Sequence, residues 1–343
     1  MRAAASALAL MIGLAAAVAG AKPVPGTATS DEYLGLQRPS TAQQLERNWV
    51  PDPRRTVHYV APAEADPAVR RYLRHNIALF RRDIATAQSP LFLFLPGTGG
   101  APDHSKWLLS AAADQGYRAI GLMYDDMPAT AEACSHDPDP TCAGRLRAKR
   151  IFGEPVSDDI DDLPAETVVS RLVATLKWLA AHHPDEGWET YLDAQGAPLW
   201  SRIAVSGHSQ GAGIAAFIAK RHEVARVALF SSPWDYYHAM VDGTDQRVVA
   251  PWVSAPESAT PPDRWFAVLH AAEPQARNIL KAYRALRVPA AHVHVLALPP
   301  RGKGSAHGSV SSDFTTPLDA AGAPAYLGDW RFLLGQPVAG PTG

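Results

Sequence analysis

The sequence predicts an α/β fold with a mostly parallel central sheet and helices on both faces. Short apolar segments alternate with helical patterns along most of the chain, which is typical of parallel strands connected by helices. Residues 91–95 (LFLFL) form a continuous apolar run, as expected for a strand buried on both faces. The chain has 343 residues and is 47% hydrophobic, which is sufficient for one large core.

The expected elements follow one another in a regular order. Strand-like segments at 57–60 and 76–80 precede the apolar run, and we interpret residues 22–85 as leading strands of the same sheet. The later segments have strand length or helical apolar spacing: strands at 119–123, 203–206, 227–230, 265–269 and 293–296, and helices at 104–115, 163–181, 212–220, 274–286 and 325–334. No segment has the composition of a linker, so residues 22–343 are predicted to form a single domain.

Residues 1–21 have the pattern of an export signal. Arg2 supplies a positive charge, residues 3–18 are almost entirely apolar, and residues 19–21 (AGA) fit a small-residue cleavage site. A membrane anchor is the alternative, but the run is alanine-rich, short for a bilayer and followed by prolines. We therefore expect an exported protein, periplasmic or secreted, with no membrane span after the signal is removed.

The only two cysteines, Cys134 and Cys142, are expected to form a disulfide, because the exported chain meets an oxidising compartment. The chain-entropy model gives such a short loop about 2–3 kcal/mol of stabilisation. A redox or metal pair is the alternative, but it lacks C-x-x-C spacing and further ligands. We interpret residues 124–157 as an irregular insertion that carries this disulfide.

The charge balance argues against some partners. A net charge of −2 gives no electrostatic reason to expect binding to nucleic acid. An acidic group precedes the helix expected at 163–181, where negative charge is favourable, so it predicts a helix start better than a calcium site. This group contains Asp158, Asp159, Asp161 and Asp162. We expect no metal site, and the sequence predicts no oligomeric state.

Residues 207–211 (GHSQG) contain the serine that we predict to be the nucleophile. They stand between the strand expected at 203–206 and a helix of small apolar residues at 212–220, and this is the setting in which G-x-S-x-G exposes a nucleophilic serine. The turn is expected to hold Ser209 in a strained conformation with its hydroxyl exposed. The backbone N–H of Gln210, at the helix start, is expected to face negative charge that forms beside Ser209. The alternative is a glycine-rich connection with an ordinary turn serine.

A serine nucleophile needs a neutral histidine as base and a carboxylate that orients it. His307 is the only histidine that follows the last expected strand and lies in a loop, and we predict it as the base. His208 is expected to pack beside the turn. Glu273 is the favoured acid and Asp235 the alternative, because both preserve the chain order of serine, acid and histidine.

A second backbone donor is expected from the loop that follows residues 91–95. Its sequence is PGTGG (96–100), and the glycines let the backbone approach a substrate closely. We predict the N–H of Thr98 as the donor, with Gly97 as the alternative. A phosphate-binding loop is disfavoured because no Lys-Ser/Thr pair follows.

With these motifs, residues 86–335 resemble the α/β-hydrolase superfamily, specifically its exported bacterial serine esterases and lipase-like members with a GHSQG turn. The resemblance implies nucleophilic attack by Ser209, a base at His307, and ester hydrolysis through an acyl-enzyme that requires no cofactor. The chain departs from many esterases in two respects: the oxyanion loop is PGTGG instead of HGGG, and the proposed acid is glutamate where aspartate is more usual.

The aromatic segment at 232–264 is expected to form part of a lid, cap or acyl pocket, with Trp234, Tyr236 and Trp252 as pocket residues. Ordinary packing of a connecting segment is the alternative. The predicted substrate is an apolar small-molecule or lipid-like carboxylic ester. A peptidase or polyester depolymerase with the same triad, and a non-catalytic binding protein on this fold, are the alternative functions.

Overall fold

The computed structural model describes residues 30–335, apart from residues 48, 50, 51, 87, 135, 136 and 162. The expected export signal at residues 1–21 lies outside the described residues. Within them, no helix is both long enough and apolar enough to cross a membrane.

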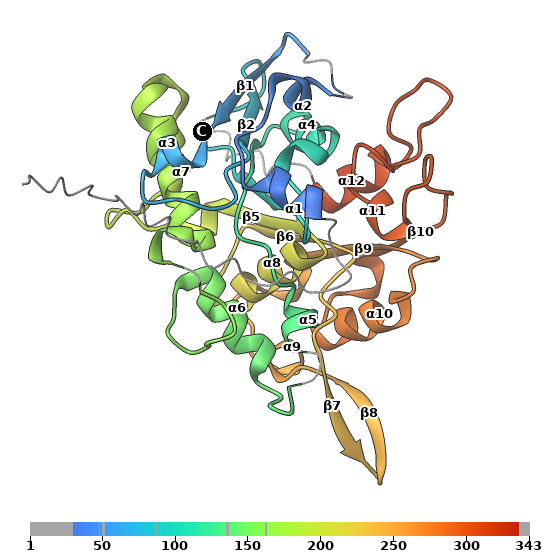
Figure 1. The fold of residues 1–343 in the computed structure, drawn as a ribbon. Coiled ribbons are helices and arrows are strands. Elements are labelled where there is room, and N and C mark those ends of the chain that lie inside the picture. The colour runs from blue at the N-terminus through green and yellow to red at the C-terminus, as the bar shows by residue number, and fades with distance from the viewer. Residues whose placement is uncertain are drawn as a thin grey trace, which may run out of the picture.

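An eight-stranded sheet forms the centre of the molecule (Figure 1). Its order is β1-β2-β4-β3-β5-β6-β9-β10. The strands are β1 (Arg55–Val60), β2 (Asn76–Arg81), β4 (Arg118–Gly121), β3 (Leu91–Leu95), β5 (Ile203–His208), β6 (Arg226–Phe230), β9 (Trp265–His270) and β10 (Val293–Leu296). The β1–β2 and β2–β4 pairs are antiparallel, and all the later pairs are parallel. The predicted α/β class is therefore confirmed, and the sheet with its strand–serine turn–helix unit is that of the α/β-hydrolase fold.

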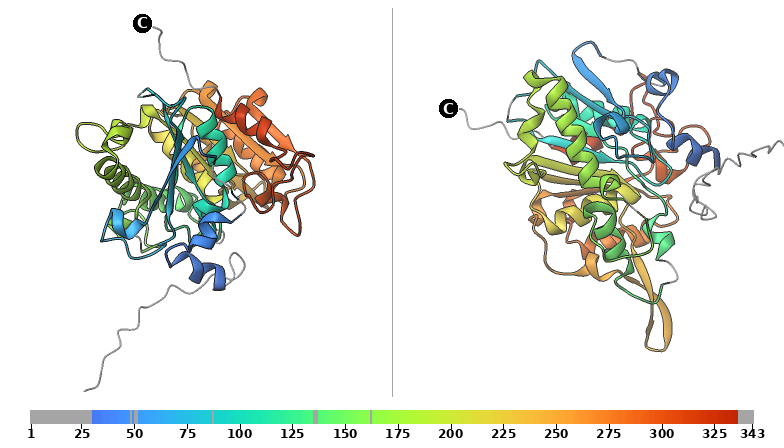
Figure 2. Two further views of the ribbon diagram at one scale, coloured as in Figure 1. Left: turned by 90° about the horizontal axis from the view of Figure 1, so that it is seen from above. Right: turned by 60° about the vertical axis from the view of Figure 1, so that its left-hand side comes forward.

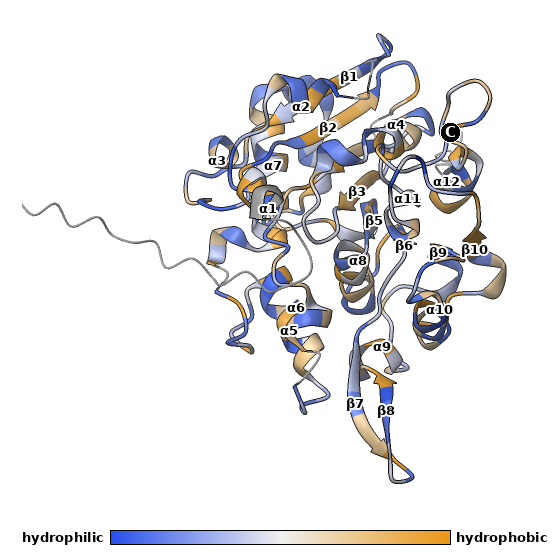
Figure 3. Ribbon diagram, turned by 45° about the vertical axis from the view of Figure 1, so that its right-hand side comes forward, coloured by the Kyte–Doolittle hydropathy of each residue, from blue (hydrophilic) through white to orange (hydrophobic). Residues whose placement is uncertain are grey.

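Helices cover both faces of the sheet (Figure 2). On one face lie α6 (Cys142–Phe152), α7 (Val168–His182), α8 (Gln210–Arg221) and α10 (Ala276–Ala285), and on the other lie α4 (Lys106–Asp114) and α12 (Leu327–Leu334). Strand β3 shows why both faces are needed. Leu91, Leu93 and Leu95 pack into the first layer, Phe92 and Phe94 into the second, and all five are fully buried. Burial of each such side chain contributes about 1.5–3 kcal/mol. Figure 3 shows β3 hydrophobic along its length, whereas much of α10 is hydrophilic.

Short elements connect these layers. They are α1 (Ser30–Leu36), α2 (Ala42–Glu46), α3 (Pro62–Ala65), α5 (Thr130–Ala133), α9 (Pro251–Ser254), α11 (Ala306–Ser309) and the 3₁₀ turns η1 (Pro102–His104), η2 (Pro164–Glu166), η3 (Pro184–Glu186), η4 (Trp188–Tyr191), η5 (Trp200–Arg202), η6 (Pro262–Arg264) and η7 (Ala290–His292). The helix expected from residue 163 starts at Val168, because the Thr167 hydroxyl caps it by accepting a hydrogen bond from the Ser170 amide at 3.1 Å.

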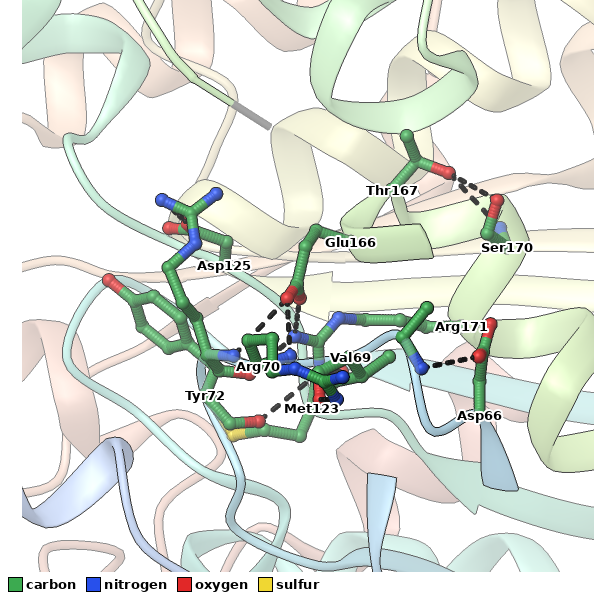
Figure 4. Close-up of polar contacts among 12 residues, drawn as sticks. Asp66, Val69, Arg70, Tyr72, Met123, Asp125, Glu166, Thr167, Ser170 and Arg171 are labelled. Carbon is green, nitrogen blue, oxygen red and sulfur yellow. Dashed lines mark hydrogen bonds and ion pairs between the residues drawn. The ribbon is translucent and has the colours of Figure 1, made fainter. Parts of the chain in front are cut away.

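A buried ion pair at the start of α7 binds the segment that precedes β2 (Figure 4). Glu166 pairs with Arg171, and both side chains are almost fully buried. The Glu166 carboxylate also accepts a hydrogen bond from the Arg70 amide at 2.7 Å, while Arg171 donates to the carbonyls of Tyr72 and Met123. Because removing one member of a buried pair costs about 3–5 kcal/mol, these contacts hold the leading strands firmly against the domain.

Residues 124–157 are more regular than expected. They contain α5 and α6, and the Cys134–Cys142 disulfide joins the C-terminal cap of α5 to the first residue of α6. The apolar pattern did not indicate α6 because part of its buried face is charged: Arg147 and Arg150 are each 1% exposed. The prediction that this segment is irregular was therefore wrong, whereas the predicted disulfide is present.

Residues 232–264 contain a β-hairpin of β7 (Tyr236–Val241) and β8 (Thr244–Val249), followed by α9. The hairpin points away from the body of the molecule (Figures 1 and 2). Its two-residue turn is Asp242-Gly243, with φ angles of 49° and 75°, and positive φ at both positions is what tight hairpins require.

Candidate active site

Ser209 occupies the sharp turn between β5 and α8, with φ 52° and ψ −118°. A residue other than glycine in such a conformation stores about 1–3 kcal/mol of strain. The flanking glycines are required because the backbones meet there. A Cβ on Gly211 would lie 2.0 Å from the Leu95 carbonyl oxygen, and one on Gly207 would lie 2.3 Å from the carbonyl carbon of Gly211. The turn thus has the geometry of a nucleophile elbow.

The loop after β3 runs directly beside this serine. A Cβ on Gly97 would lie 2.9 Å from the Ser209 Cβ and 2.9 Å from His208 Nδ1, so only glycine allows the approach. The loop then turns tightly, with the Gly100 amide donating to the Gly97 carbonyl at 2.8 Å. The structure therefore brings both predicted oxyanion residues of this loop, Gly97 and Thr98, to the wall of the cavity that Ser209 lines.

His307 lies in the single-turn helix α11, and not in a loop as expected. The Ser305 hydroxyl caps this turn by accepting a hydrogen bond from the Gly308 amide at 3.1 Å. His307 Nδ1 is 2.6 Å from Glu273 Oε2, and since a carboxylate only accepts, Nδ1–H is the donor. This contact leaves the other ring nitrogen, Nε2, unprotonated in the neutral imidazole.

Glu273 follows β9 and is 5% exposed. Its second oxygen, Oε1, accepts hydrogen bonds from the His270 amide at 2.7 Å and the Ser231 hydroxyl at 2.5 Å. Burial alone would favour the protonated acid, but His307 and these donors outweigh it and lower the pKa of Glu273. The side chain is therefore a charged carboxylate at neutral pH, held from both sides.

Asp235, the alternative acid, has other partners. It accepts hydrogen bonds from Arg147 Nε at 2.6 Å and Nη2 at 2.7 Å, and from Trp252 Nε1 at 2.9 Å. The Arg147 and Asp235 side chains are 1% and 0% exposed. Asp235 lies at the same cavity as Ser209, but its carboxylate is committed to the buried arginine, whereas Glu273 contacts the histidine.

His208 supports His307 in a way that the sequence did not indicate. Its Nε2 lies 2.8 Å from the backbone carbonyl oxygen of His307, and the two ring centroids are 4.5 Å apart. Burial, together with the neighbouring His307, lowers the pKa of His208 to about 3, so the ring is neutral and Nε2–H donates. The Trp234 ring lies 5.5 Å from the His307 ring on centroid distance. His307 is thus held through both its backbone and its ring.

The predicted residues meet at one cavity of about 370 Å³. Ser209, His307, Gln210 and Thr98 line it, and Glu273 lies behind His307. Of the predicted pocket aromatics, Trp234 lines the cavity. Trp252 packs on Phe217, with ring centroids 5.2 Å apart, and the Tyr236 hydroxyl donates to the Asn278 carbonyl, so neither is among the lining residues.

Sequence reasoning did not identify three polar residues of the cavity wall: Glu132 from α5, Arg247 from β8 and Gln275 before α10. Burial raises the pKa of Glu132. The cavity therefore combines apolar surface from Trp234 and two alanines with the acidic side chains of Glu132 and Asp235 and the basic side chain of Arg247. The lining is thus of mixed polarity, and the apolar substrate expected from the sequence stays a prediction.

No protein-family model matches the chain, and no curated protein sequence matches it. Several solved structures are similar to the chain in fold. A putative dienelactone hydrolase from Klebsiella pneumoniae is 13% identical, with 82% of this chain and 98% of that chain covered and a TM-score of 0.40. An esterase from the bacterial hormone-sensitive lipase family is 19% identical, with 90% and 99% covered and a TM-score of 0.42. Carboxyl esterase 2 from the fungus Tuber melanosporum is 14% identical, with 84% and 90% covered and a TM-score of 0.42. Likeness at this level leaves the reaction to be inferred from this chain's own residues.

Proposed function

We propose that the chain is a serine hydrolase that cleaves carboxylic esters through an acyl-enzyme. One observation carries the proposal: His307, with Nδ1 bound to the buried Glu273, lines the same cavity as Ser209 on its strained turn. A strained serine that lines a cavity, a histidine whose tautomer is fixed, and a charged carboxylate behind it are the three parts that acyl transfer requires.

In the first half of the reaction the Ser209 oxygen attacks the ester carbonyl carbon, and the serine proton passes to His307 Nε2. Glu273 stabilises the resulting imidazolium, and the N–H groups of Gln210 and Thr98 bind the oxyanion. The carbon–oxygen bond to the alcohol then breaks, and the alcohol leaves with the proton from His307. In the second half His307 takes a proton from water as the water oxygen attacks the acyl carbon. The bond between this carbon and the Ser209 oxygen then breaks, His307 returns the proton to that oxygen, and the carboxylic acid leaves.

The cavity indicates the size of the substrate. A volume of about 370 Å³ is near the lower end of small-molecule sites, so we propose an ester with short acyl and alcohol groups. This size favours a small ester over a polyester or a folded polypeptide. The segment at 232–264 contributes Trp234, Asp235 and Arg247 to the wall, and we propose that it acts as a partial cap.

We also propose that the protein is exported after removal of residues 1–21 and acts as a single domain over residues 22–343. The Cys134–Cys142 disulfide supports export, because structural disulfides persist mainly outside the reducing cytosol.

Labelling with a fluorophosphonate probe tests the proposed activity, together with turnover of nitrophenyl esters from acetate to octanoate. We expect the wild-type protein to react with the probe and to prefer short esters. Ser209→Ala should abolish labelling and lower kcat by several orders of magnitude. Ser254→Ala is the matched control, because Ser254 is an exposed serine in α9. Folded wild-type protein that neither labels nor turns over would favour a binding protein and end the proposal.

A further inference from the structure

A second cluster of reactive side chains lies at the outer edge of the sheet. His58 is on the edge strand β1, while His183 and Glu186 come from the segment that follows α7. Each offers one ligand atom, and the three atoms lie within 4.8 Å of one another. We propose that His58, His183 and Glu186 form a zinc-binding site that the hydrolase reaction does not use.

The donor set suits this ion. Two imidazole nitrogens and one carboxylate oxygen are ligands that Zn²⁺ takes in proteins, and a hard cation such as Mg²⁺ would prefer oxygen ligands only. The three side chains come from two segments that lie far apart in the sequence. His58 and Glu186 are separated by 128 positions, and His183 lies in the same segment as Glu186. All three are half-buried, so their chain segments fix them more closely than freely exposed side chains.

The ligand atoms are near enough to one another for a single ion. His58 Nε2 is 2.8 Å from Glu186 Oε2, and the two imidazole rings stack with centroids 3.8 Å apart and planes at 24°. Zinc bonds of about 2.0–2.2 Å in a tetrahedral arrangement place ligand atoms roughly 3.3 Å from one another. The atoms lie within 4.8 Å of one another, so closing the site requires the His183 ring to turn out of the stack until both imidazole lone pairs meet at one point.

A buried donor orients the carboxylate. Trp188 Nε1 donates to Glu186 Oε2 at 2.8 Å, and the Trp188 side chain is fully buried. Such a partner behind a ligand is the usual support of a metal site, because it fixes the direction of the ligand's lone pairs.

The surroundings leave space for a fourth ligand. A cavity of about 510 Å³ is lined by His183 and Glu186, together with Arg82 and Arg118, and has room for a water molecule. Arg82 Nη2 lies 3.7 Å from Glu186 Oε1, but the arginine side chain is 71% exposed and can turn into solvent when a cation binds. Arg118 is held by the Thr86 carbonyl at 2.6 Å and over the Phe80 ring.

The position of the site indicates its role. Strand β1 is the first of eight in the sheet order, whereas Ser209 follows β5 in the middle. A bound ion would tie this edge strand to the segment after α7. We therefore expect zinc to stabilise the fold and to leave ester turnover unchanged.

The test uses the full chain without a histidine tag, stripped of metal with a chelator. Zn²⁺ binding is measured by calorimetry and by competition with a chromophoric chelator, and Co²⁺ serves as a spectroscopic probe of coordination. We expect one ion per chain, an increase in the thermal midpoint, and unchanged nitrophenyl ester turnover. His183→Ala and Glu186→Gln should each weaken binding by about tenfold or more.

His182→Ala is the matched control. His182 precedes His183 and lines the same cavity, but it is not one of the three residues whose ligand atoms lie together, and its Nδ1 bonds to the Trp178 carbonyl. The proposed site is supported if His182→Ala and His307→Ala bind Zn²⁺ with wild-type affinity while His183→Ala binds it more weakly. Absence of stoichiometric binding, equal loss in His182→Ala and His183→Ala, or loss in His307→Ala would each overturn it. Circular dichroism of each variant separates a lost ligand from a lost fold.

Discussion

Glu273→Gln tests the assignment of the catalytic acid, because the two oxygens of Glu273 have different partners. Oε1 accepts from the His270 amide at 2.7 Å, and a backbone N–H can only donate. The oxygen of the new amide should therefore stay on that side, which turns its NH₂ group toward His307 Nδ1. Nδ1 must then accept, so the ring proton moves to Nε2, and the imidazole can no longer take the proton of Ser209.

The expected loss in kcat is about 10⁴-fold, the size seen when a triad carboxylate becomes an amide and the wrong tautomer forms. At 1.36 kcal/mol per factor of ten, this is about 5.5 kcal/mol of transition-state stabilisation. KM should change little, because Glu273 lies behind His307 and is not among the residues that line the cavity. Steady-state kinetics on nitrophenyl butyrate, with circular dichroism to confirm folding, measure both effects.

Asp235→Asn is the comparison that can refute this reasoning. It removes the charge that pairs with buried Arg147, so we expect about 3–5 kcal/mol less stability. Where this variant remains folded, kcat should stay within about tenfold of the wild-type value. If Glu273→Gln keeps more than about a tenth of wild-type kcat, or if folded Asp235→Asn loses far more turnover than Glu273→Gln, Glu273 is not the acid.

Three further predictions concern the surroundings of Ser209. Gly97→Ala should lower kcat by about 100-fold, because its added Cβ would lie only 2.9 Å from Ser209 Cβ and would displace the loop that carries the proposed oxyanion donor. Gly328→Ala, at an open position, should leave turnover unchanged. In the folded protein the pKa of His208 is about 3, whereas in the unfolded chain this pKa has its ordinary value of 6.5. Between these pH values the unfolded chain binds a proton that the folded protein does not. The free energy of unfolding should therefore fall by up to about 1.4 kcal/mol for each unit by which the pH is lowered. Urea unfolding at pH 5 and pH 7 should show a smaller pH dependence in His208→Gln, and an equal dependence would contradict the assignment. Replacing residues 238–247 by a two-residue turn removes Arg247 from the cavity wall. Turnover of the nitrophenyl octanoate ester relative to the acetate ester should then rise by about tenfold. An unchanged preference would exclude a role of the segment at 232–264 as a cap.

The features predicted correctly from the sequence rest on local patterns. The continuous apolar run at 91–95 needs no knowledge of its neighbours to indicate a strand buried on both faces, and β3 is that strand. The same holds for the strand and helix around residues 207–211, because the glycines that the turn requires are part of the motif itself. In contrast, α11 has only four residues, which is too short for helical periodicity to appear.

The choice between two acids could not be made locally. Glu273 and Asp235 both follow strands that lead to the same edge of the sheet, so position alone leaves both open. The deciding partner of Asp235 is Arg147, which lies 88 positions earlier in a helix that the apolar pattern did not reveal. A charged residue on a buried helix face looks like a solvent-exposed one in the sequence, so this contact appears only in the folded chain.

The same arginine connects the segment at 124–157 to the helix that follows Ser209. Its guanidinium lies under the start of α8, where Nη1 is 3.4 Å from the Gln210 carbonyl, and a Cβ on Gly213 would meet Nη2 at 2.2 Å. Gly213 is therefore needed for the arginine to fit, and not for the turn itself. The arginine also holds Asp235, next to the Trp234 that lies beside His307. One buried ion pair therefore contacts both the helix that follows Ser209 and the wall beside His307. The segment at 124–157, which the sequence analysis interprets as an insertion, thus supports the candidate active site through Arg147.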